Sequence, residues 1–171
     1  AAALAGALLV VSLCLGHTVW RRAQDPRPPA DSSIVNLPAW RELCEWIAEN
    51  TPSDAVFLTP RLDQTFHWYA GRAEVVSRKD IPQDARGIVE WWRRNQALYA
   101  ASSADEASWR ESLAELGSKR LIELGHEFGA DYVVTSAYPK LNLERIGPLS
   151  ASYALYRLPA RPGALKRDPR E

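Results

Sequence analysis

The sequence has no methionine, only two cysteines and only three histidines among its 171 residues. Cys14 and Cys44 fall in different predicted helices, so we expect no disulfide and infer no redox compartment. His17, His67 and His126 are far apart and share no metal-ligand spacing with each other or with cysteine, so we expect no metal ion.

The sequence also lacks the short motifs of common enzyme classes. It has no glycine-rich phosphate loop, no Walker motif and no G-x-S-x-G turn. This argues against a self-contained nucleotide enzyme or hydrolase, and we expect no cofactor. Lysine and arginine together number 21, as do aspartate and glutamate, so the formal net charge is zero. Without a basic excess, nucleic acid is not an expected partner.

The first twenty residues carry no charge and are followed directly by Arg21 and Arg22. A helix of about 20 apolar residues is long enough to cross a bilayer, so residues 1–20 predict a transmembrane helix in an integral membrane protein. A truncated signal peptide and a buried core helix are the alternatives. The segment shows neither the basic start and clean cleavage site of a signal peptide nor the polar face of a core helix. Because the chain begins without methionine, we expect this helix to be the last span of a longer, polytopic protein.

Three segments are expected after this helix. Residues 21–36 are rich in proline and polar side chains and predict a linker, residues 37–158 predict a soluble α/β domain, and residues 159–171 predict a polar tail. The two arginines that open the linker favour a cytoplasmic flank, but loops further upstream could outweigh them.

The soluble domain alternates apolar runs with amphipathic segments. The apolar runs predict four strands, at 55–59, 73–77, 131–136 and 152–158. The connections between the first three are long enough for crossovers, so we expect a small, mostly parallel sheet of about four strands flanked by helices. The last pair of strands could be antiparallel.

Helices are predicted between these strands. The first covers 37–50, with Trp40 and Ile47 on its apolar face, and the second covers 84–99, with Ile88, Trp92 and Tyr99 as its buried face.

A third helix is expected to open at the capping-box match over 103–106 and to bury Leu113 and Leu116. Gly117 should break or kink it, and Gly129 sits where a glycine that ends a helix belongs.

Polar and aromatic side chains crowd the segments that follow the first two strands. If these strands are parallel neighbours, side chains beyond their carboxyl ends converge on one rim, where ligands bind in open α/β sheets. Arginine and lysine there could hold a phosphate or carboxylate, and nearby aromatics suit a sugar ring or a lipid headgroup. The predicted ligand-binding residues are Thr59, Arg61, Tyr69, Arg72, Lys79 and Asp80. The alternative is a short helix that turns Phe66 and Tyr69 into the core and leaves the charges solvated.

Four stretches carry a resemblance to known families. CEWIAENTPSDAVFLTP (44–60), TFHWYAGRAEVVSRKDIPQD (65–84), GIVEWWR (87–93) and GADYVVTS (129–136) resemble a bacterial domain of unknown function. That domain forms the C-terminal soluble part of polytopic membrane proteins. The first stretch is also similar to the start of the extracytoplasmic domain of C-type (GT-C) glycosyltransferases.

The resemblance implies an extracytoplasmic domain that helps to recognise a lipid-phosphate-linked sugar or an acceptor. It implies no catalytic residue, because the catalytic acid of GT-C enzymes lies in an early loop outside this chain. Two alternatives stay open: a non-catalytic structural or interaction domain of a membrane protein, and a single-pass anchored binding module. In each case the expected partner includes the lipid bilayer.

Overall fold

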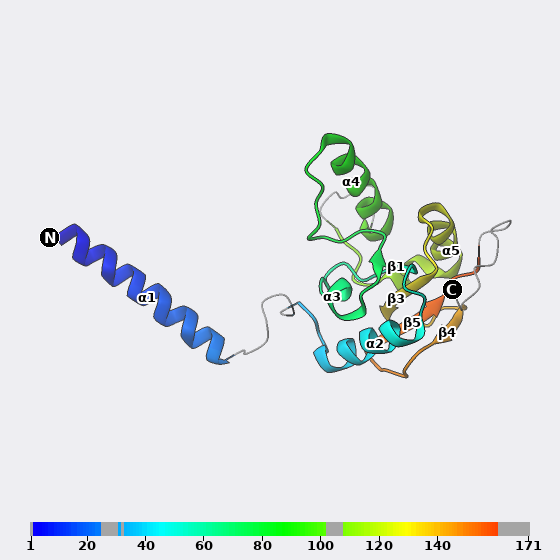
Figure 1. Cartoon of the computed structure of the whole chain (residues 1–171), viewed down its shortest axis with the longest axis horizontal. Coiled ribbons are helices and arrows are strands. Elements are labelled where there is room, and N and C mark those ends of the chain that lie inside the picture. Colours follow the sequence, from blue (N-terminus) through cyan, green and yellow to red (C-terminus); the bar gives the residue numbers. More distant parts are fainter. Residues whose placement is uncertain (1, 25–30, 32, 102–107, 161–171) are drawn as a thin grey trace. The chain divides into compact units, whose positions relative to one another are not determined.

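A computed structural model describes residues 2–24, 31, 33–101 and 108–160. The chain divides into two compact units, Ala1–Ser32 and Ser33–Glu171. The helices are α1 (Ala2–Gln24), α2 (Leu37–Asn50), α3 (Phe66–Ala70), α4 (Ala85–Tyr99), the 3-10 helix η2 (Leu113–Leu116) and α5 (Gly117–Phe128). The strands are β1 (Val56–Leu58), β2 (Ala73–Glu74), β3 (Tyr132–Ser136), β4 (Glu144–Ile146) and β5 (Tyr153–Arg157) (Figure 1).

The first unit contains α1, which confirms the predicted apolar helix. Within the described residues it is the one helix whose length and composition allow it to cross a membrane, over Leu4–Gln24. The helix continues past residue 20, so Arg21 and Arg22 form part of its last turn. Residues 25–30 and 32 of the predicted linker and most of the predicted tail, 161–171, lie outside the described residues.

The second unit is built on a five-stranded mixed sheet with the strand order β2-β1-β3-β5-β4. Strand β1 pairs in parallel with β2 and β3, as expected for the crossovers between them. Strand β5 pairs antiparallel with β3 and β4, so the prediction of a mostly parallel sheet of four strands is wrong in count and only partly right in direction. Strand β4 escaped prediction because this edge strand has only three residues, Glu-Arg-Ile, and no alternating apolar pattern.

Alternate side chains of the central strands enter two different core clusters. Phe57, Tyr132 and Leu155 pack with residues of α2 and α3, including Trp40 and Phe66. Asn36 caps α2 through its side chain, which accepts from the backbone N–H of Ala39 at 3.2 Å, and the helix ends before Pro52 as predicted.

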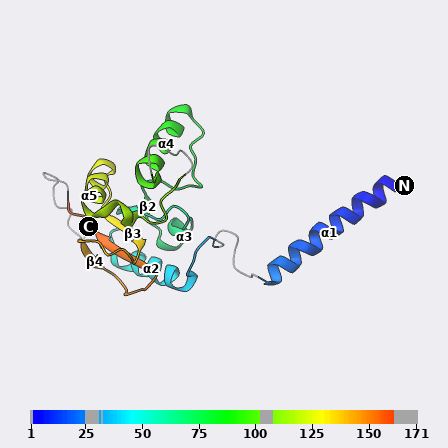
Figure 2. The same cartoon turned by 180° about the vertical axis from the view of Figure 1, so that it is seen from behind.

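The other cluster joins Leu58, Val133 and Tyr156 of the strands to side chains of α4, η2 and α5. Figures 1 and 2 show α2 and α5 on opposite sides of the central strands. Both faces of the central sheet are therefore buried, which explains the continuous apolar runs of β3 and β5.

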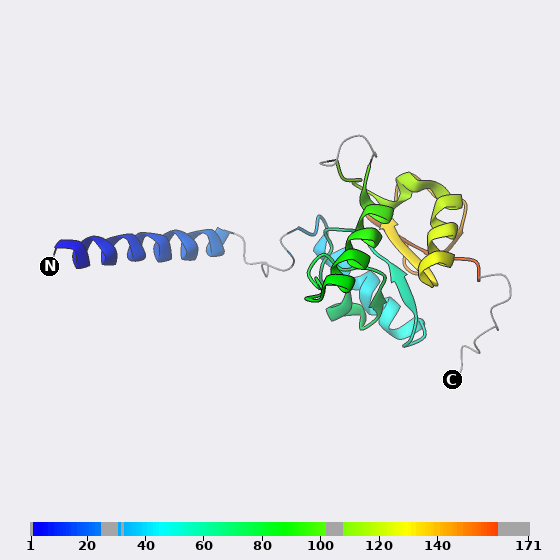
Figure 3. The same ribbon diagram turned by 90° about the horizontal axis from the view of Figure 1, so that it is seen from above.

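The predicted buried face of α4 is partly wrong. Tyr99 is buried, but Ile88 and Trp92 are 42% and 50% exposed. Buried side chains occur only near the C-terminal end of the helix, because its first half projects beyond the sheet (Figures 1 and 3). The helical periodicity identified the apolar stripe correctly but could not show that the core ends halfway along it.

The prediction for the following segment is also partly wrong. The capping box expected at 103–106 lies on residues 102–107, outside the described residues. Residues 108–112 are not helical, and Trp109 forms an antiparallel bridge with Ala100. A capping box does occur nearby, between Ser112 and Glu115, and it opens η2.

The two glycines around α5 occupy the positions that the sequence suggests. Gly117 and Gly129 have φ of 73° and 70°, a left-handed region that glycine enters without steric cost. Gly117 separates η2 from α5 and Gly129 ends α5, as predicted.

Phe57 offers a direct test of this core. It is fully buried, stacks on Tyr132 with ring centroids 4.9 Å apart and tilts against Phe66 at 5.1 Å. Phe57→Ala should lower the free energy of unfolding by about 3–5 kcal/mol, because it removes apolar contacts and leaves a cavity. Urea unfolding followed by near-UV circular dichroism measures this. The exposed Val89→Ala should stay within about 0.5 kcal/mol of wild type, and an equal loss in both variants would contradict the assignment of Phe57 to the core.

Candidate functional site

A cleft of about 440 Å³ lies between the β2 side of the sheet and the first half of α4. Its lining comes from α3, β2 with the loop that follows it, and α4: His67, Glu74–Ser77, Asp80, Pro82, Gly87, Glu90, Trp91 and Arg94. The cleft therefore contains carboxylates, an imidazole, a guanidinium and an indole, which are groups that can orient a bound ligand.

The floor of the cleft is set by the parallel pairing of β1 with β2. Thr59 directly follows β1 and Glu74 ends β2, so both lie at the carboxyl edge of these strands. The Thr59 hydroxyl donates to Oε2 of Glu74 at 2.6 Å. The Tyr99 hydroxyl in turn donates to the Thr59 carbonyl at 2.8 Å. These bonds fix the Glu74 carboxyl group in one position at the edge of the sheet.

The environment of Glu74 alters its acidity. Burial, with a smaller contribution from the negative charge of Asp80, raises the pKa of Glu74 to about 7, although the hydrogen bond from Thr59 and the nearby His67 lower it. A carboxyl group that changes charge near neutral pH inside a cleft is a common property of functional sites.

The α4 wall of the cleft is tied to the segment after β2. The Trp91 indole donates to the Ser77 carbonyl at 2.8 Å, and Nη1 of Arg94 donates to the Val75 carbonyl at 3.0 Å. Nε of Arg94 also donates to Glu90 at 2.8 Å. Glu90 is thus paired, which leaves Glu74 and Asp80 as the acidic groups of the cleft that face no guanidinium in the described contacts.

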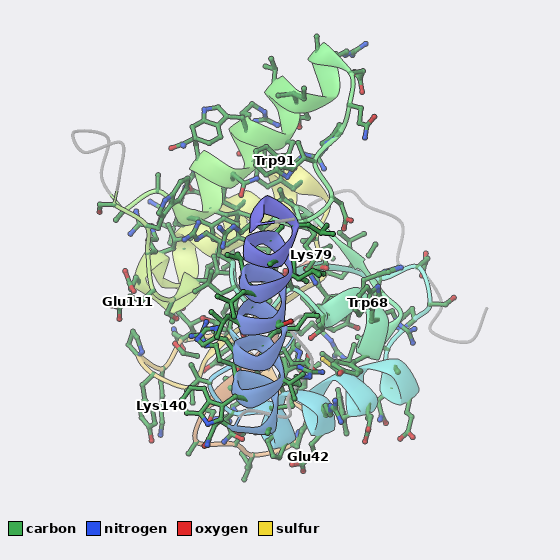
Figure 4. The ribbon with its side chains drawn as sticks, turned by 90° about the vertical axis from the view of Figure 1, so that its left-hand side faces the viewer. Glu42, Trp68, Lys79, Trp91, Glu111 and Lys140 are labelled. Atoms are coloured by element: carbon green, nitrogen blue, oxygen red, sulfur yellow. The ribbon has the colours of Figure 1, made fainter. Side chains whose placement is uncertain are left out.

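The structure places the predicted ligand-binding residues in several different settings. Asp80 lines the cleft and Thr59 lies beneath it, bonded to Glu74. Lys79 is exposed near the cleft, with its Nζ 4.8 Å from the centre of the Trp68 ring (Figure 4). These three residues are the part of the predicted set that the fold brings near one another.

Arg61 and Tyr69 contribute to other surfaces. The Arg61 guanidinium lies 4.6 Å from the centre of the Trp109 ring, and partial burial lowers its pKa. The Tyr69 hydroxyl accepts from Nη2 of Arg41 at 2.9 Å, and the same guanidinium lies over the Tyr69 ring. Neither residue lines the cleft.

Arg72 donates hydrogen bonds to several backbone carbonyls and to the side chain of Thr51. Its Nη2 donates to the carbonyls of Ala48 at 2.6 Å and Thr51 at 2.8 Å, and its Nε donates to Oγ1 of Thr51 at 3.1 Å. Its Nη1 donates to the Ala70 carbonyl at 3.3 Å. Arg72 thus satisfies carbonyls at the C-terminal end of α2, where a cation is favoured. A role for Arg72 in binding an anion stays a prediction.

Sequence reasoning did not include Glu74 among the site residues and did not predict that α4 forms one wall of the cleft. The available signal was a glutamate inside the apolar run Ala-Glu-Val-Val, because a charged residue beside buried apolar neighbours needs a partner or a function. A second buried carboxyl, Asp63, was hidden in a polar stretch. It is 7% exposed, and burial raises its pKa to about 7.

Neither cysteine forms a disulfide: Cys14 is exposed and Cys44 is buried. Across the part of the chain that the structure describes, no three side chains of His, Cys, Asp or Glu are arranged to hold a metal ion.

Comparison with known proteins gives one match. Residues 38–98, from α2 to nearly the end of α4, match a family described as a domain of unknown function (DUF6798). This region contains Glu74 and the whole lining of the cleft. The comparison gives no link to GT-C glycosyltransferases. No curated protein and no solved structure shows significant similarity to the chain.

The hydrogen bonds of Arg72 predict a structural effect of its removal. Arg72→Ala should lower the free energy of unfolding by about 1–3 kcal/mol, because several carbonyls at the end of α2 lose a charged donor. Chemical unfolding of the full chain in detergent micelles measures the change. Arg86→Ala, at an exposed position at the start of α4, is the matched control and should remain near wild type. Equal stability of the two variants would show that the contacts of Arg72 contribute nothing.

The raised pKa of Glu74 predicts a pH dependence of stability. Its pKa is near 7 when folded and nearer 4 when unfolded, so the folded state binds more protons between these values. The stability that this group contributes is therefore present below about pH 4 and is lost as the pH rises towards 7. Glu74→Gln removes this loss, so the stability of the variant should rise relative to wild type as the pH increases from about 5 to about 7.5.

Urea unfolding at several pH values measures this difference. Glu111→Gln, at an exposed position outside the cleft, should differ from wild type by an amount independent of pH. A pH-independent difference for Glu74→Gln as well would mean that Glu74 is ionised throughout this range.

Proposed function

We propose that this domain is a membrane-anchored recognition module whose cleft binds the sugar of a lipid-linked sugar phosphate. In this proposal the domain is extracytoplasmic, belongs to a polytopic, glycosyltransferase-like protein, and assists recognition of the lipid-linked donor or of an acceptor. The observation that carries the proposal is the fixed Glu74 carboxyl in a cleft that also contains Asp80 and Trp91.

The chemistry of the cleft favours a neutral ligand that is rich in hydroxyl groups. Carboxylate oxygens accept hydrogen bonds from sugar hydroxyls, and the wall of the cleft includes an indole with an apolar face. Inside the cleft, the acidic Glu74 and Asp80 would repel a phosphate group. A phosphate attached to the sugar is better served by Arg78 and Lys79, which are exposed in the loop after β2.

Recognition is proposed in preference to catalysis because of how the acidic groups are engaged. Glu74 accepts from Thr59, and Glu90 accepts from Arg93 and Arg94. Both carboxyl groups are thus held by the protein itself. The Thr59 hydroxyl that bonds to Glu74 is buried, so it is not presented to a ligand in the cleft.

A second candidate is a structural or interaction domain without a ligand of its own. The contacts of Arg72 and Tyr69 favour it, because both side chains from the predicted binding set bond to other parts of the domain. The two candidates differ in whether the cleft binds a ligand in solution.

The test is titration of the full chain, in lipid nanodiscs, with a polyprenyl phosphate that carries a glucosyl group. Polyprenyl phosphate alone and methyl glucoside alone separate the contributions of the phosphate and the sugar. Glu74→Gln and Asp80→Asn should each weaken binding of the glycosylated probe about tenfold, the loss expected for one hydrogen bond to a charged group.

Glu111→Gln is the matched control and should bind as wild type does. Equal affinity of the glycosylated and bare lipids, or unchanged affinity in both cleft variants, would contradict sugar recognition by the cleft. Absence of binding to all three probes would favour the structural alternative.

A further inference from the structure

The projecting part of the second unit exposes four large apolar side chains. Ile81 precedes α4, and Ile88, Val89 and Trp92 lie on its first half. Their exposed fractions are 52%, 42%, 68% and 50%. We refer to these four residues as the tip. Isolated apolar side chains are normal on protein surfaces, but a group on one projecting segment marks an interaction site.

The core of the domain does not use the tip. None of its four residues belongs to either core cluster, whereas Leu98 and Tyr99 near the other end of α4 are fully or nearly fully buried. Trp92 meets Trp109 edge-on, with ring centroids 6.2 Å apart, yet half of its surface stays exposed. The apolar surface of the tip residues is therefore not used to form the two core clusters of the domain.

Three basic side chains, Arg78, Lys79 and Arg86, are exposed on the segment that carries the tip, together with the exposed Asp80 and Asp84. Lys79 also lies over the Trp68 ring of α3, which is 71% exposed (Figure 4). Indole rings, aliphatic side chains and long cationic side chains are the groups that collect at the boundary between lipid headgroups and acyl chains. Cations there reach the phosphates while their apolar stems stay in less polar surroundings.

The chain itself limits how far the domain can move from a bilayer that α1 spans. Helix α1 ends at Gln24 and the second unit begins at Ser33, nine residues later. Nine extended residues reach at most roughly 30 Å. Such a short connection keeps the domain beside the membrane surface at a high effective concentration, so even a weak apolar contact with lipid becomes populated.

We propose that the tip docks into the headgroup region of the bilayer that anchors the chain. Ile81, Ile88, Val89 and Trp92 enter the interface, and Arg78, Lys79 and Arg86 contact anionic headgroups around them. Pro82 and Gly87, which lie between Ile81 and Ile88 in the sequence, also line the cleft, so docking brings the cleft to the level of the headgroups. The docking does not depend on what the cleft binds.

The experiment places an environment-sensitive NBD fluorophore on the tip of the full chain. The label is attached at Val89→Cys in a Cys14→Ser background, in which the remaining Cys44 is fully buried. The protein is reconstituted in vesicles of phosphatidylcholine and phosphatidylglycerol that contain lipids spin-labelled near the acyl carbonyl. The matched control carries the label at Lys140→Cys, an exposed position in the loop between β3 and β4, away from α4 (Figure 4).

Docking predicts that the label at position 89 is quenched about twofold or more strongly than the label at position 140, with blue-shifted emission. Adding Ile88→Asp to the labelled chain should reduce quenching at position 89 to the level of the control, because a charged side chain enters the interface poorly. Ile88 is half exposed, so this variant should remain folded, which circular dichroism verifies.

Three results would overturn the proposal. Equal quenching at both positions would reflect the tether alone, and no quenching at either would place the tip in water. A blue shift at position 89 that appears without lipid and grows with protein concentration would identify a second copy of the chain as the occupant. Sugar binding is measured separately, so failure of docking and failure of the cleft to bind a sugar are distinguishable.

Discussion

The whole second unit depends on burying both faces of three short neighbouring strands. Strands β1, β3 and β5 send alternate side chains into two separate apolar clusters, so neither face can be left in water. Helices α2 and α3 supply the partners for one face, and α4, η2 and α5 supply them for the other. Strand β1 also pairs in parallel with β2, and this pairing brings Thr59 beside Glu74. The position of the candidate site therefore depends on the arrangement of the strands in the sheet.

Much of the fold could be predicted because the strands and helices carry strong local patterns. The apolar run at 131–136 and the amphipathic helix at 37–50 are both found where the sequence places them. Strand β4 could not be predicted, because its residues gain their conformation only by pairing with β5. Likewise, the exposure of Ile88 depends on how far α4 extends past the sheet, which no local pattern encodes.

The candidate site was less predictable than the fold. The parallel pairing of the first two strands was expected and is confirmed, and it brings Thr59 and Asp80 to the cleft or its floor. The partners of individual side chains could not be predicted, because a sequence pattern does not show which backbone or side-chain groups surround a given arginine. Arg72 faces the end of α2 and Arg94 faces β2, although the pattern gives no reason to separate them. The raised pKa of Glu74 follows from burial, which depends on the tertiary structure around the end of β2.

The hydrogen bonds of Arg72 also connect the C-terminal end of α2 to the end of α3. One guanidinium holds the last turn of α2 and the carbonyl of Ala70 at the end of α3, two residues before Arg72 itself and four before Glu74. Thr51 and Ala48 at the end of α2 and Glu74 at the edge of the sheet are therefore joined through one side chain. A substitution that shifts the last turn of α2 should for this reason also displace the floor of the cleft.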